Sequence, residues 1–425
     1  MQHLILGAGP AGVIAAETLR KQRPADAITI VGDEPEPPYS RMAIPYLLMG
    51  HVPESGTYLR KSPSHLSDLN INVVRGRARS VDAAARSVTL DSGEVLRFDK
   101  LLIATGSQPV RPPIPGMDLV GVHPCWTLED ARHIMALAQP GARVLQMGAG
   151  FIGCIIMEAL VARGVRLSVV EMGDRMVPRM MGPTAGGMIK NWCQTKGVQV
   201  FTGTRVEAIS QQGAALDVRL SNGQTVAADL VISATGVRPA IGFLQDSGIT
   251  CLQGVLTDEH LQTNIPGIYA AGDCAEAFDK VSGKTIVSAI QPNAAEQARV
   301  AALNMTGQTT ALKGVTQINV LDTLGLISTS FGNWEGEPGG EHVELTDKAA
   351  GRHLSLQFKG DVMVGANSVG WTEHVGIMRG LVEGAVKLGD WKAELLRDPT
   401  QLAAAYLACA QGQGHWSGAM DARRR

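Results

Sequence analysis

Two stretches of the chain carry three glycines at the same spacing, each directly after a run of apolar residues. In this pattern the first glycine makes a tight turn, the second lets the backbone approach a pyrophosphate, and the third lets a helix pack closely on a strand. A single motif is weak evidence, but two with matching strand and helix patterns predict two dinucleotide sites. The expected phosphate-binding residues are Gly7, Gly9, Pro10, Ala11 and Gly12 in the first motif, and Gly148, Gly150, Phe151, Ile152 and Gly153 in the second.

An acidic residue follows each motif at the end of a second apolar strand. The segment "AITIVGDE" ends in Asp33 and Glu34, and we favour Glu34 as the ribose-binding acid, with Asp33 next. Glu171 lies eighteen residues beyond Gly153, where the second acid is expected. A carboxylate there binds the ribose hydroxyls and repels a 2′-phosphate, which favours NADH over NADPH.

Three further motifs narrow the class of protein. Two strands end in an Ala-Thr-Gly turn, at Gly106 and Gly236, and "TNIPGIYAAGDCAEA" ends a strand at Gly272-Asp273. With the two glycine motifs, the chain resembles the FAD-dependent pyridine nucleotide–disulfide oxidoreductases over nearly its whole length. The resemblance implies that the first motif holds FAD and the second holds NAD(P)H. It further implies FAD contacts at Thr105, Gly106, Gly272 and Asp273, the last on the ribityl chain, and an NAD contact at Gly236.

The same resemblance implies an α/β fold. It consists of two Rossmann-like dinucleotide-binding domains in the three-layer arrangement of glutathione reductase, followed by a C-terminal α+β domain. Strands are expected between 316 and 370, with a hairpin turn at 359–361, and one amphipathic helix over 374–398. In relatives this last domain covers the flavin and often contributes to dimerisation, so a homodimer is one expectation. The expected domains are FAD-binding, 1–113 and 243–311; NAD-binding, 114–242; and C-terminal, 312–425.

The segment "PYSRMAIPYL" (38–47) lacks the residues that two branches of the family use for chemistry. Coenzyme A-disulfide reductases and water-forming NADH oxidases carry a redox-active cysteine where this chain has Met42. Ferredoxin reductases carry a flavin-side lysine where it has Tyr46. A thioether forms no thiolate, so disulfide reduction through this position is excluded.

Three other candidate flavin contacts follow from the resemblance. Arg41 is expected on the FAD pyrophosphate, the alternative being a surface salt bridge. Tyr46 lines the flavin or packs in the core, with equal weight. The helix that begins at Gln291 and Pro292 is expected to direct its positive N-terminus at the flavin, or else is an ordinary buried helix. Ile155 replaces a glutamate that relatives hold near the nicotinamide.

Composition excludes several other functions. A formal net charge of −2 gives no basic face for nucleic acid. The six cysteines are scattered without a CxxC pair, so free thiols are expected, no metal site is expected, and Cys154 and Cys274 are read as packing residues. No apolar run is long enough to span a membrane and no leader pattern is present, which predicts a cytoplasmic protein. The pair His415-Trp416, in a glycine-rich tail, is the remaining aromatic feature without a role.

The sequence therefore predicts an enzyme that passes hydride from NADH to FAD and electrons onward to an external acceptor. A ferredoxin, a rubredoxin or an oxygenase component is the leading acceptor by resemblance. The alternative acceptor is small, such as oxygen or a quinone. An alternative of another class is a slow FAD- and NADH-binding sensor, or a flavoprotein subunit of a complex.

Overall fold

A computed structural model describes residues 1–315 and 317–410 of the chain. The chain forms two compact units. Unit 1 contains residues 1–110, 126–128 and 237–315, and unit 2 contains 111–125, 129–236 and 316–425. The positions 411–425, which include His415 and Trp416, lie outside the described residues.

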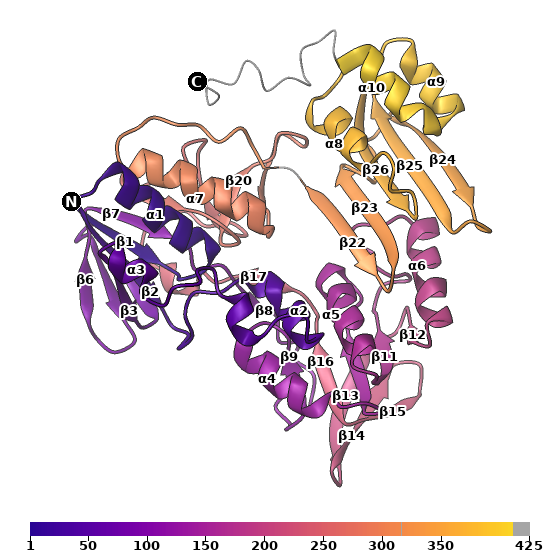
Figure 1. Ribbon diagram of the computed structural model, residues 1–425, viewed down its shortest axis with the longest axis horizontal. Coiled ribbons are helices and arrows are strands. Elements are labelled where there is room, and N and C mark those ends of the chain that lie inside the picture. The colour runs from indigo at the N-terminus through magenta and orange to yellow at the C-terminus, as the bar shows by residue number, and fades with distance from the viewer. Residues whose placement is uncertain (316, 411–425) are drawn as a thin grey trace. The chain divides into compact units, whose positions relative to one another are not determined.

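Unit 1 is built on a five-stranded parallel sheet in the order β19-β7-β1-β2-β3, of which Figure 1 labels β7, β1, β2 and β3. Both faces of this sheet are buried, which explains why its strands are continuous apolar runs. On β1, Ile5 packs into one core with helices α1 and α7, while Leu4 and Leu6 pack into the opposite core. The bounds are β1 Gln2–Leu6, β2 Ala27–Gly32, β3 Ile71–Arg75, β7 Lys100–Ile103, β19 Ile268–Ala270, α1 Pro10–Gln22 and α7 Gln291–Met305.

Smaller elements complete unit 1. An antiparallel meander, β4-β5-β6, covers the second face of the sheet, and β17 pairs with β8 where the chain crosses out of and back into the unit. The remaining bounds are η1 Arg41–Ala43, α2 Ile44–Leu48, η2 Glu54–Thr57, α3 His65–Asp68, β4 Ala78–Asp82, β5 Ser87–Leu90, β6 Val95–Arg97, β8 Ser107–Pro109, β17 Val237–Pro239, η3 Gly242–Leu244, β18 Val255–Leu256, β20 Ala275–Phe278 and β21 Thr285–Val287.

Unit 2 repeats this plan. Its parallel sheet has the order β12-β11-β10-β16-β9, with the glycine-motif strand β10 in the middle as β1 is in unit 1. An antiparallel meander, β13-β14-β15, again packs on one face. The bounds are β9 Val122–Pro124, α4 Leu128–Leu137, β10 Arg143–Met147, α5 Phe151–Ala162, β11 Arg166–Val170, α6 Pro183–Thr195, β12 Gln199–Phe201, β13 Val206–Gln212, β14 Ala215–Leu220, β15 Thr225–Ala228 and β16 Leu230–Ser233.

Unit 2 also contains a five-stranded antiparallel sheet in the order β22-β23-β26-β25-β24. The expected hairpin joins β25 and β26, turning at Gly360, which has a φ of +56°. Asn367 of β26 fixes this sheet to the loop before α6, because its amide accepts from the N–H of Gly182 at 3.0 Å and donates to the carbonyl of Met180 at 2.9 Å. The bounds are β22 Ile318–Thr323, β23 Leu326–Gly332, β24 Glu341–Asp347, β25 Arg352–Lys359 and β26 Val362–Val369.

The single helix expected over 374–398 is wrong, since two helices are present: α8 Val375–Glu383 and α9 Trp391–Arg397. Ala385 has a φ of +44°, a left-handed conformation that a helix does not continue through, and Gly389 has a φ of +54°. The helices η4 Pro399–Gln401 and α10 Leu402–Ala410 follow. Apart from this break, the predicted fold class is confirmed.

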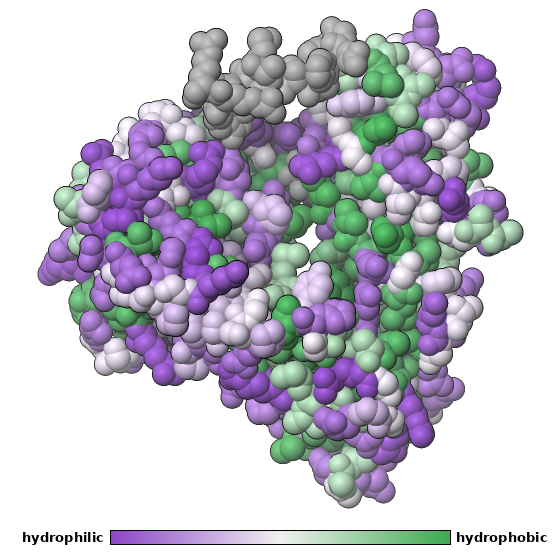
Figure 2. Space-filling view, viewed as in Figure 1, coloured by the Kyte–Doolittle hydropathy of each residue, from purple (hydrophilic) through white to green (hydrophobic). Residues whose placement is uncertain are grey.

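Across the residues that the structure describes, no helix is both long and apolar enough to cross a membrane. Within the same residues, no three side chains of metal-ligating type are grouped to hold an ion. Figure 2 shows a mostly hydrophilic surface on the visible face of unit 1.

Candidate dinucleotide sites

The first glycine motif forms the turn between β1 and α1. Gly7 has a φ of +118°, and a Cβ there would lie 2.0 Å from the carbonyl oxygen of Ala104. A Cβ on Gly12 would lie 1.9 Å from the carbonyl oxygen of Gly7. A Cβ on Gly9 would meet no atom within 4 Å, and Gly9 caps α1 without a side-chain hydrogen bond. The outer glycines are therefore required by the chain's own packing, whereas the middle one borders open space at a helix N-terminus, which fits a pyrophosphate.

Glu34 follows β2, as predicted, and its carboxylate is held by two neighbours. Oε1 accepts a hydrogen bond of 2.6 Å from Nη2 of Arg41, and Oε2 accepts one from the hydroxyl of Tyr39. Burial is the largest cause of a strongly raised pKa for Tyr39. Asp33 instead pairs with Arg77 at 2.7 Å on the surface.

Asp273 lies at the end of β19, where a ribityl ligand is expected. Its carboxylate accepts a hydrogen bond of 2.9 Å from the hydroxyl of Ser107, and burial raises its pKa above the usual value. The N–H of Gly272 donates to the side-chain oxygen of Gln297 at 2.7 Å, and the amide nitrogen of Gln297 is buried with no partner among the described residues. The half-buried carboxylate of Asp273, and the amide nitrogen of Gln297 left without a partner among the described residues, are polar groups that a polar ligand would complete.

The Ala-Thr-Gly turn brings the two crossings of the chain together. The hydroxyl of Thr105 donates to the carbonyl of Ala240 at 2.9 Å, and the N–H of Ala240 donates to the carbonyl of Gly106 at 2.9 Å. Gly106 has a φ of +66° and open space at its Cβ position. Thr105 is therefore engaged by the chain itself, and Gly106 is the residue with room for a ligand.

The segment that holds Met42 and Tyr46 lies beside the start of α7. The hydroxyl of Ser40 donates to the side-chain oxygen of Gln291 at 2.6 Å. Pro292 lies in the first turn of α7, and no side chain caps this helix. Met42 and Tyr46 are 56% and 54% exposed, and this exposure rejects the core-packing alternative for Tyr46.

The second motif repeats the geometry of the first. A Cβ on Gly148 or Gly153 would lie within 2.5 Å of a carbonyl oxygen, whereas one on Gly150 would meet nothing within 4 Å. Phe151 and Ile152 open α5 and are half-buried. Gly236, which follows β16, has a φ of +107° and open space at its Cβ position.

Sequence reasoning missed a buried side chain that hydrogen-bonds the backbone of this second turn. Gln146 is fully buried on β10, and its amide nitrogen donates to the carbonyls of Gly148 at 2.8 Å and Gly153 at 2.9 Å. A single polar residue inside an apolar strand directly before a glycine motif was the available signal.

Glu171 follows β11 and is oriented by backbone groups. One carboxylate oxygen accepts from the N–H of Ala149 and the other from the N–H of Gly173, each at 2.7 Å. The nearby Arg175 is occupied, because it pairs with Asp174 at 2.7 Å and donates to the carbonyl of Met181 at 2.8 Å. The end of β11 therefore presents the carboxylate of Glu171 in a fixed orientation, and the guanidinium of Arg175 is already bonded to other groups of the chain.

The cysteines give no activated nucleophile. All six are free, and burial raises the pKa of each, to about 12 for Cys125 and Cys193. Cys154 and Cys274 are fully buried, in agreement with their reading as packing residues.

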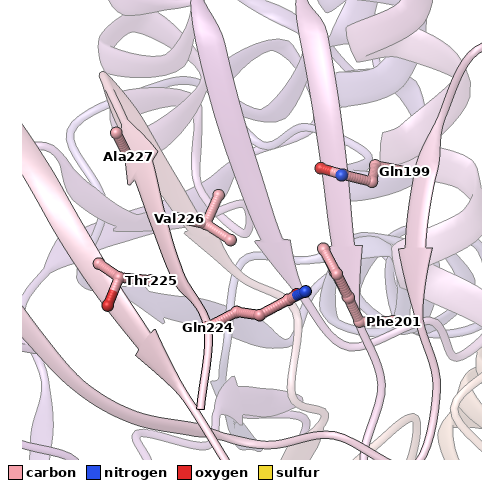
Figure 3. A pocket seen from close by; sticks show the side chains of 6 residues that line it. All are labelled: Gln199, Phe201, Gln224, Thr225, Val226 and Ala227. Atoms are coloured by element: carbon pink, nitrogen blue, oxygen red, sulfur yellow. The ribbon is translucent and has the colours of Figure 1, made fainter. Parts of the chain in front are cut away.

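A shallow groove elsewhere in unit 2 lies between two strand edges (Figure 3). It contains none of the predicted nucleotide-binding residues, and it forms no part of the candidate site. Its lining residues are Gln199, Phe201, Gln224, Thr225, Val226 and Ala227.

The comparisons with known proteins agree with this geometry. A family model described as pyridine nucleotide-disulphide oxidoreductase matches residues 1–301, which include both glycine motifs. The chain belongs to this family. Like other pyridine nucleotide-disulphide oxidoreductases, it is an FAD- and NAD(P)H-dependent enzyme that transfers electrons to an external acceptor.

Three relatives illustrate the range of the family. The chain is 30% identical over 362 residues to the NADH-dependent phenylglyoxylate dehydrogenase subunit epsilon of Aromatoleum evansii, covering 85% of this chain and 86% of the relative. It is 32% identical over 319 residues to an NADH oxidase of Methanocaldococcus jannaschii, covering 72% and 70%. A solved ferredoxin reductase from Rhodopseudomonas palustris is similar with a TM-score of 0.81 at 27% identity, covering 92% of this chain and 99% of that one.

Proposed function

We propose that FAD binds at the first glycine motif and NADH at the second, and that electrons leave to a ferredoxin- or rubredoxin-type protein. The observation that carries this proposal is the repeated turn. In both motifs the chain's own backbone occupies the space that a Cβ on either outer glycine would take, while the middle glycine faces open space. We further propose an FAD domain over 1–113 and 243–311, an NAD domain over 114–242, and a C-terminal domain from 312.

The charged residues of unit 1 fit the order of groups along FAD. Glu34 would bind the adenosine ribose and Asp273 the ribityl chain. Arg41 bonds Glu34 directly and is close enough to Asp273 to lower its pKa, although burial outweighs that effect. A cation between these two acids is where the pyrophosphate of FAD belongs, which supports the assignment of Arg41.

Bound FAD would supply two-electron acceptance from the nicotinamide and delivery of electrons singly or as a pair. The chain's own residues would position it. The N-terminus of α7 has no side-chain cap from its N-cap residue and carries a partial positive charge beside Gln291, which favours negative charge on the nearest part of a ligand. Met42 and Tyr46 are exposed on the segment that Ser40 joins to Gln291, and they would be covered by the flavin and would exclude water from it.

The second site favours NADH over NADPH in this proposal. Glu171 presents a carboxylate that accepts ribose hydroxyls, and a 2′-phosphate placed there would meet its negative charge. Arg175, the nearby cation whose bonds are described above, is not free to bind that phosphate.

The missing thiol directs the acceptor outside the chain. No described cysteine is exposed and activated. By the family resemblance, Met42 stands where disulfide-reducing relatives place their cysteine. The test is anaerobic reoxidation: the enzyme is reduced with NADH, and its flavin absorbance is followed after addition of a ferredoxin, a rubredoxin, a quinone or oxygen. Reoxidation by an iron–sulfur protein at least about tenfold faster than by the small acceptors supports the proposal. Faster reoxidation by oxygen or quinone would overturn the protein acceptor.

A second candidate is a flavoprotein subunit of a larger NADH-linked complex. It is favoured by the similarity to subunit epsilon of a dehydrogenase, which covers most of both chains. Purification from the native host distinguishes the two, since a subunit elutes with its partners in stable stoichiometry and a free reductase does not.

A further inference from the structure

Residues 126–128 belong to a different unit from the residues that flank them in the sequence. The residues on either side belong to unit 2, while Trp126, Thr127 and Leu128 belong to unit 1. The indole N–H of Trp126 donates to the carbonyl of Ser107 at 3.1 Å, and the N–H of Leu128 donates to the hydroxyl of Tyr39 at 3.3 Å. No nucleotide motif falls on this segment, and the assignment of FAD-binding residues does not include it.

Trp126 also holds Arg41. The guanidinium carbon of Arg41 lies 5.2 Å from the ring centroid of Trp126 and 5.5 Å from the ring centroid of Tyr39. Nη1 donates to the carbonyl of Trp126 at 2.7 Å and to the hydroxyl of Tyr39 at 2.8 Å. Contacts of a cation with two aromatic rings and two acceptors leave the side chain little freedom.

The held guanidinium retains donors for a ligand. A guanidinium has five N–H groups, and the hydrogen bonds to Glu34, Tyr39 and Trp126 use three of them. The Nε–H and one Nη2–H have no partner among the described residues, and the side chain is 35% exposed. Planar paired donors on a fixed guanidinium suit phosphate oxygens.

Trp126 thus connects both acids of the proposed FAD site. It contacts Arg41, which bonds Glu34, and it bonds the carbonyl of Ser107, whose hydroxyl holds Asp273. We infer that Trp126 is a positioning residue for FAD, which acts by fixing Arg41 on the pyrophosphate. This inference rests on the proposed placement of FAD at the first glycine motif.

The test measures FAD affinity of the apoprotein by flavin fluorescence, without any turnover. Trp126→Ala removes the ring and the indole donor, and it should raise the FAD dissociation constant about tenfold, equivalent to about 1.4 kcal/mol. Trp126→Phe keeps a ring and should raise it about threefold. The matched control is Trp371→Ala in unit 2, where the ring faces Arg352 at 5.4 Å, and the dissociation constant should not change.

A double-mutant cycle shows whether Trp126 acts through Arg41. In an Arg41→Gln background, Trp126→Ala should have little further effect on FAD affinity. An undiminished effect in that background would overturn the inference, as would wild-type affinity in Trp126→Ala or equal weakening in Trp371→Ala. If circular dichroism shows that Trp126→Ala does not fold, the Phe variant with and without Arg41→Gln decides by the same criteria. Failure of the wild-type apoprotein to bind FAD would instead contradict the proposed function.

Discussion

The hydroxyl of Ser40 donates a hydrogen bond of 2.6 Å to the side-chain oxygen of Gln291, which lies 251 residues further along the chain. This contact joins the segment without its cysteine to the helix N-terminus expected to face the flavin. Met42 and Tyr46 follow Ser40 on the same segment and are exposed. By the family resemblance, these two residues are expected to stand where relatives hold a thiol and a lysine.

The first prediction separates structural from ligand-facing glycines. Gly9→Ala and Gly150→Ala should leave the thermal stability of the apoprotein nearly unchanged, because φ is negative at both positions and a Cβ meets no atom within 4 Å. The same variants should weaken FAD and NADH binding respectively by about tenfold or more, since the backbone must approach a pyrophosphate. Calorimetry of the apoprotein and titration with each nucleotide measure the two effects.

The outer glycines provide the contrast. Gly12→Ala and Gly153→Ala should lower the free energy of unfolding by about 2–3 kcal/mol, because the Cβ would clash with a backbone carbonyl. Unchanged apoprotein stability in these variants, or unchanged nucleotide affinity in the first pair, would contradict this account of the turns.

The second prediction concerns thiols. Iodoacetamide at pH 8 should leave NADH-dependent flavin reduction intact, because burial raises the pKa of every cysteine. Met42→Cys places a thiol at a position that is exposed without FAD, so the apoprotein of this variant should gain one alkylated residue that bound FAD protects. Mass spectrometry counts the modified residues. Rapid inactivation of the wild-type enzyme would show that one of its own cysteines takes part.

The third prediction concerns nucleotide preference. Glu171→Gln removes the charge that opposes a 2′-phosphate but keeps a side-chain acceptor, and Glu171→Ala removes both. The ratio of NADH to NADPH efficiency should fall about tenfold in the first variant and further in the second, through KM of both nucleotides. Steady-state kinetics with a saturating dye acceptor measure the ratio. An unchanged ratio in both variants would show that preference is set elsewhere.

The fourth prediction is a pH dependence of stability. His3 is buried on β1 and bonds Asp26 at 2.9 Å, while its second ring nitrogen has no partner within the described part of the chain. Burial lowers the pKa of His3 below 6.5. The unfolded chain then binds more protons than the folded one below about pH 6.5, so stability is lost as the pH falls through that value toward the lowered folded pKa. His3→Gln should flatten the acid side of the stability curve by at most about 1.4 kcal/mol per pH unit.

Urea unfolding of the full-length protein between pH 5 and 8 measures the free energy of unfolding against pH. The matched control is His51→Gln, because His51 is exposed. A curve for His3→Gln that parallels the wild type would show that the other histidines and carboxylates carry the dependence.

The geometry that sequence reasoning predicted is found where that geometry is local. A glycine motif is a turn between adjacent elements, so its spacing predicts its geometry, and Gly7, Gly12, Gly148 and Gly153 have the close backbone contacts that the motif requires. The fold class was implied by the family resemblance that these motifs carry. The pairing of Glu34 with Arg41 was not predicted, although both residues were named as candidates.

Other features depend on contacts between distant segments. Trp126 meets Ser107 and Arg41 only because the chain re-enters unit 1 for three residues, and no spacing rule shows this. The break between α8 and α9 depends on the left-handed conformation of Ala385. Alanine favours helices, and the apolar periodicity of the segment therefore predicted one continuous helix.

The most direct test of the central claim is the stoichiometry of anaerobic reduction. If hydride from NADH reaches a flavin with no protein thiol beside it, FAD is the only two-electron acceptor, and about one NADH per FAD should bleach the flavin band completely. The end point should be the same after alkylation. A requirement for about two NADH per FAD would reveal a second two-electron centre, and would contradict the reading of Met42 as the replacement for the missing cysteine.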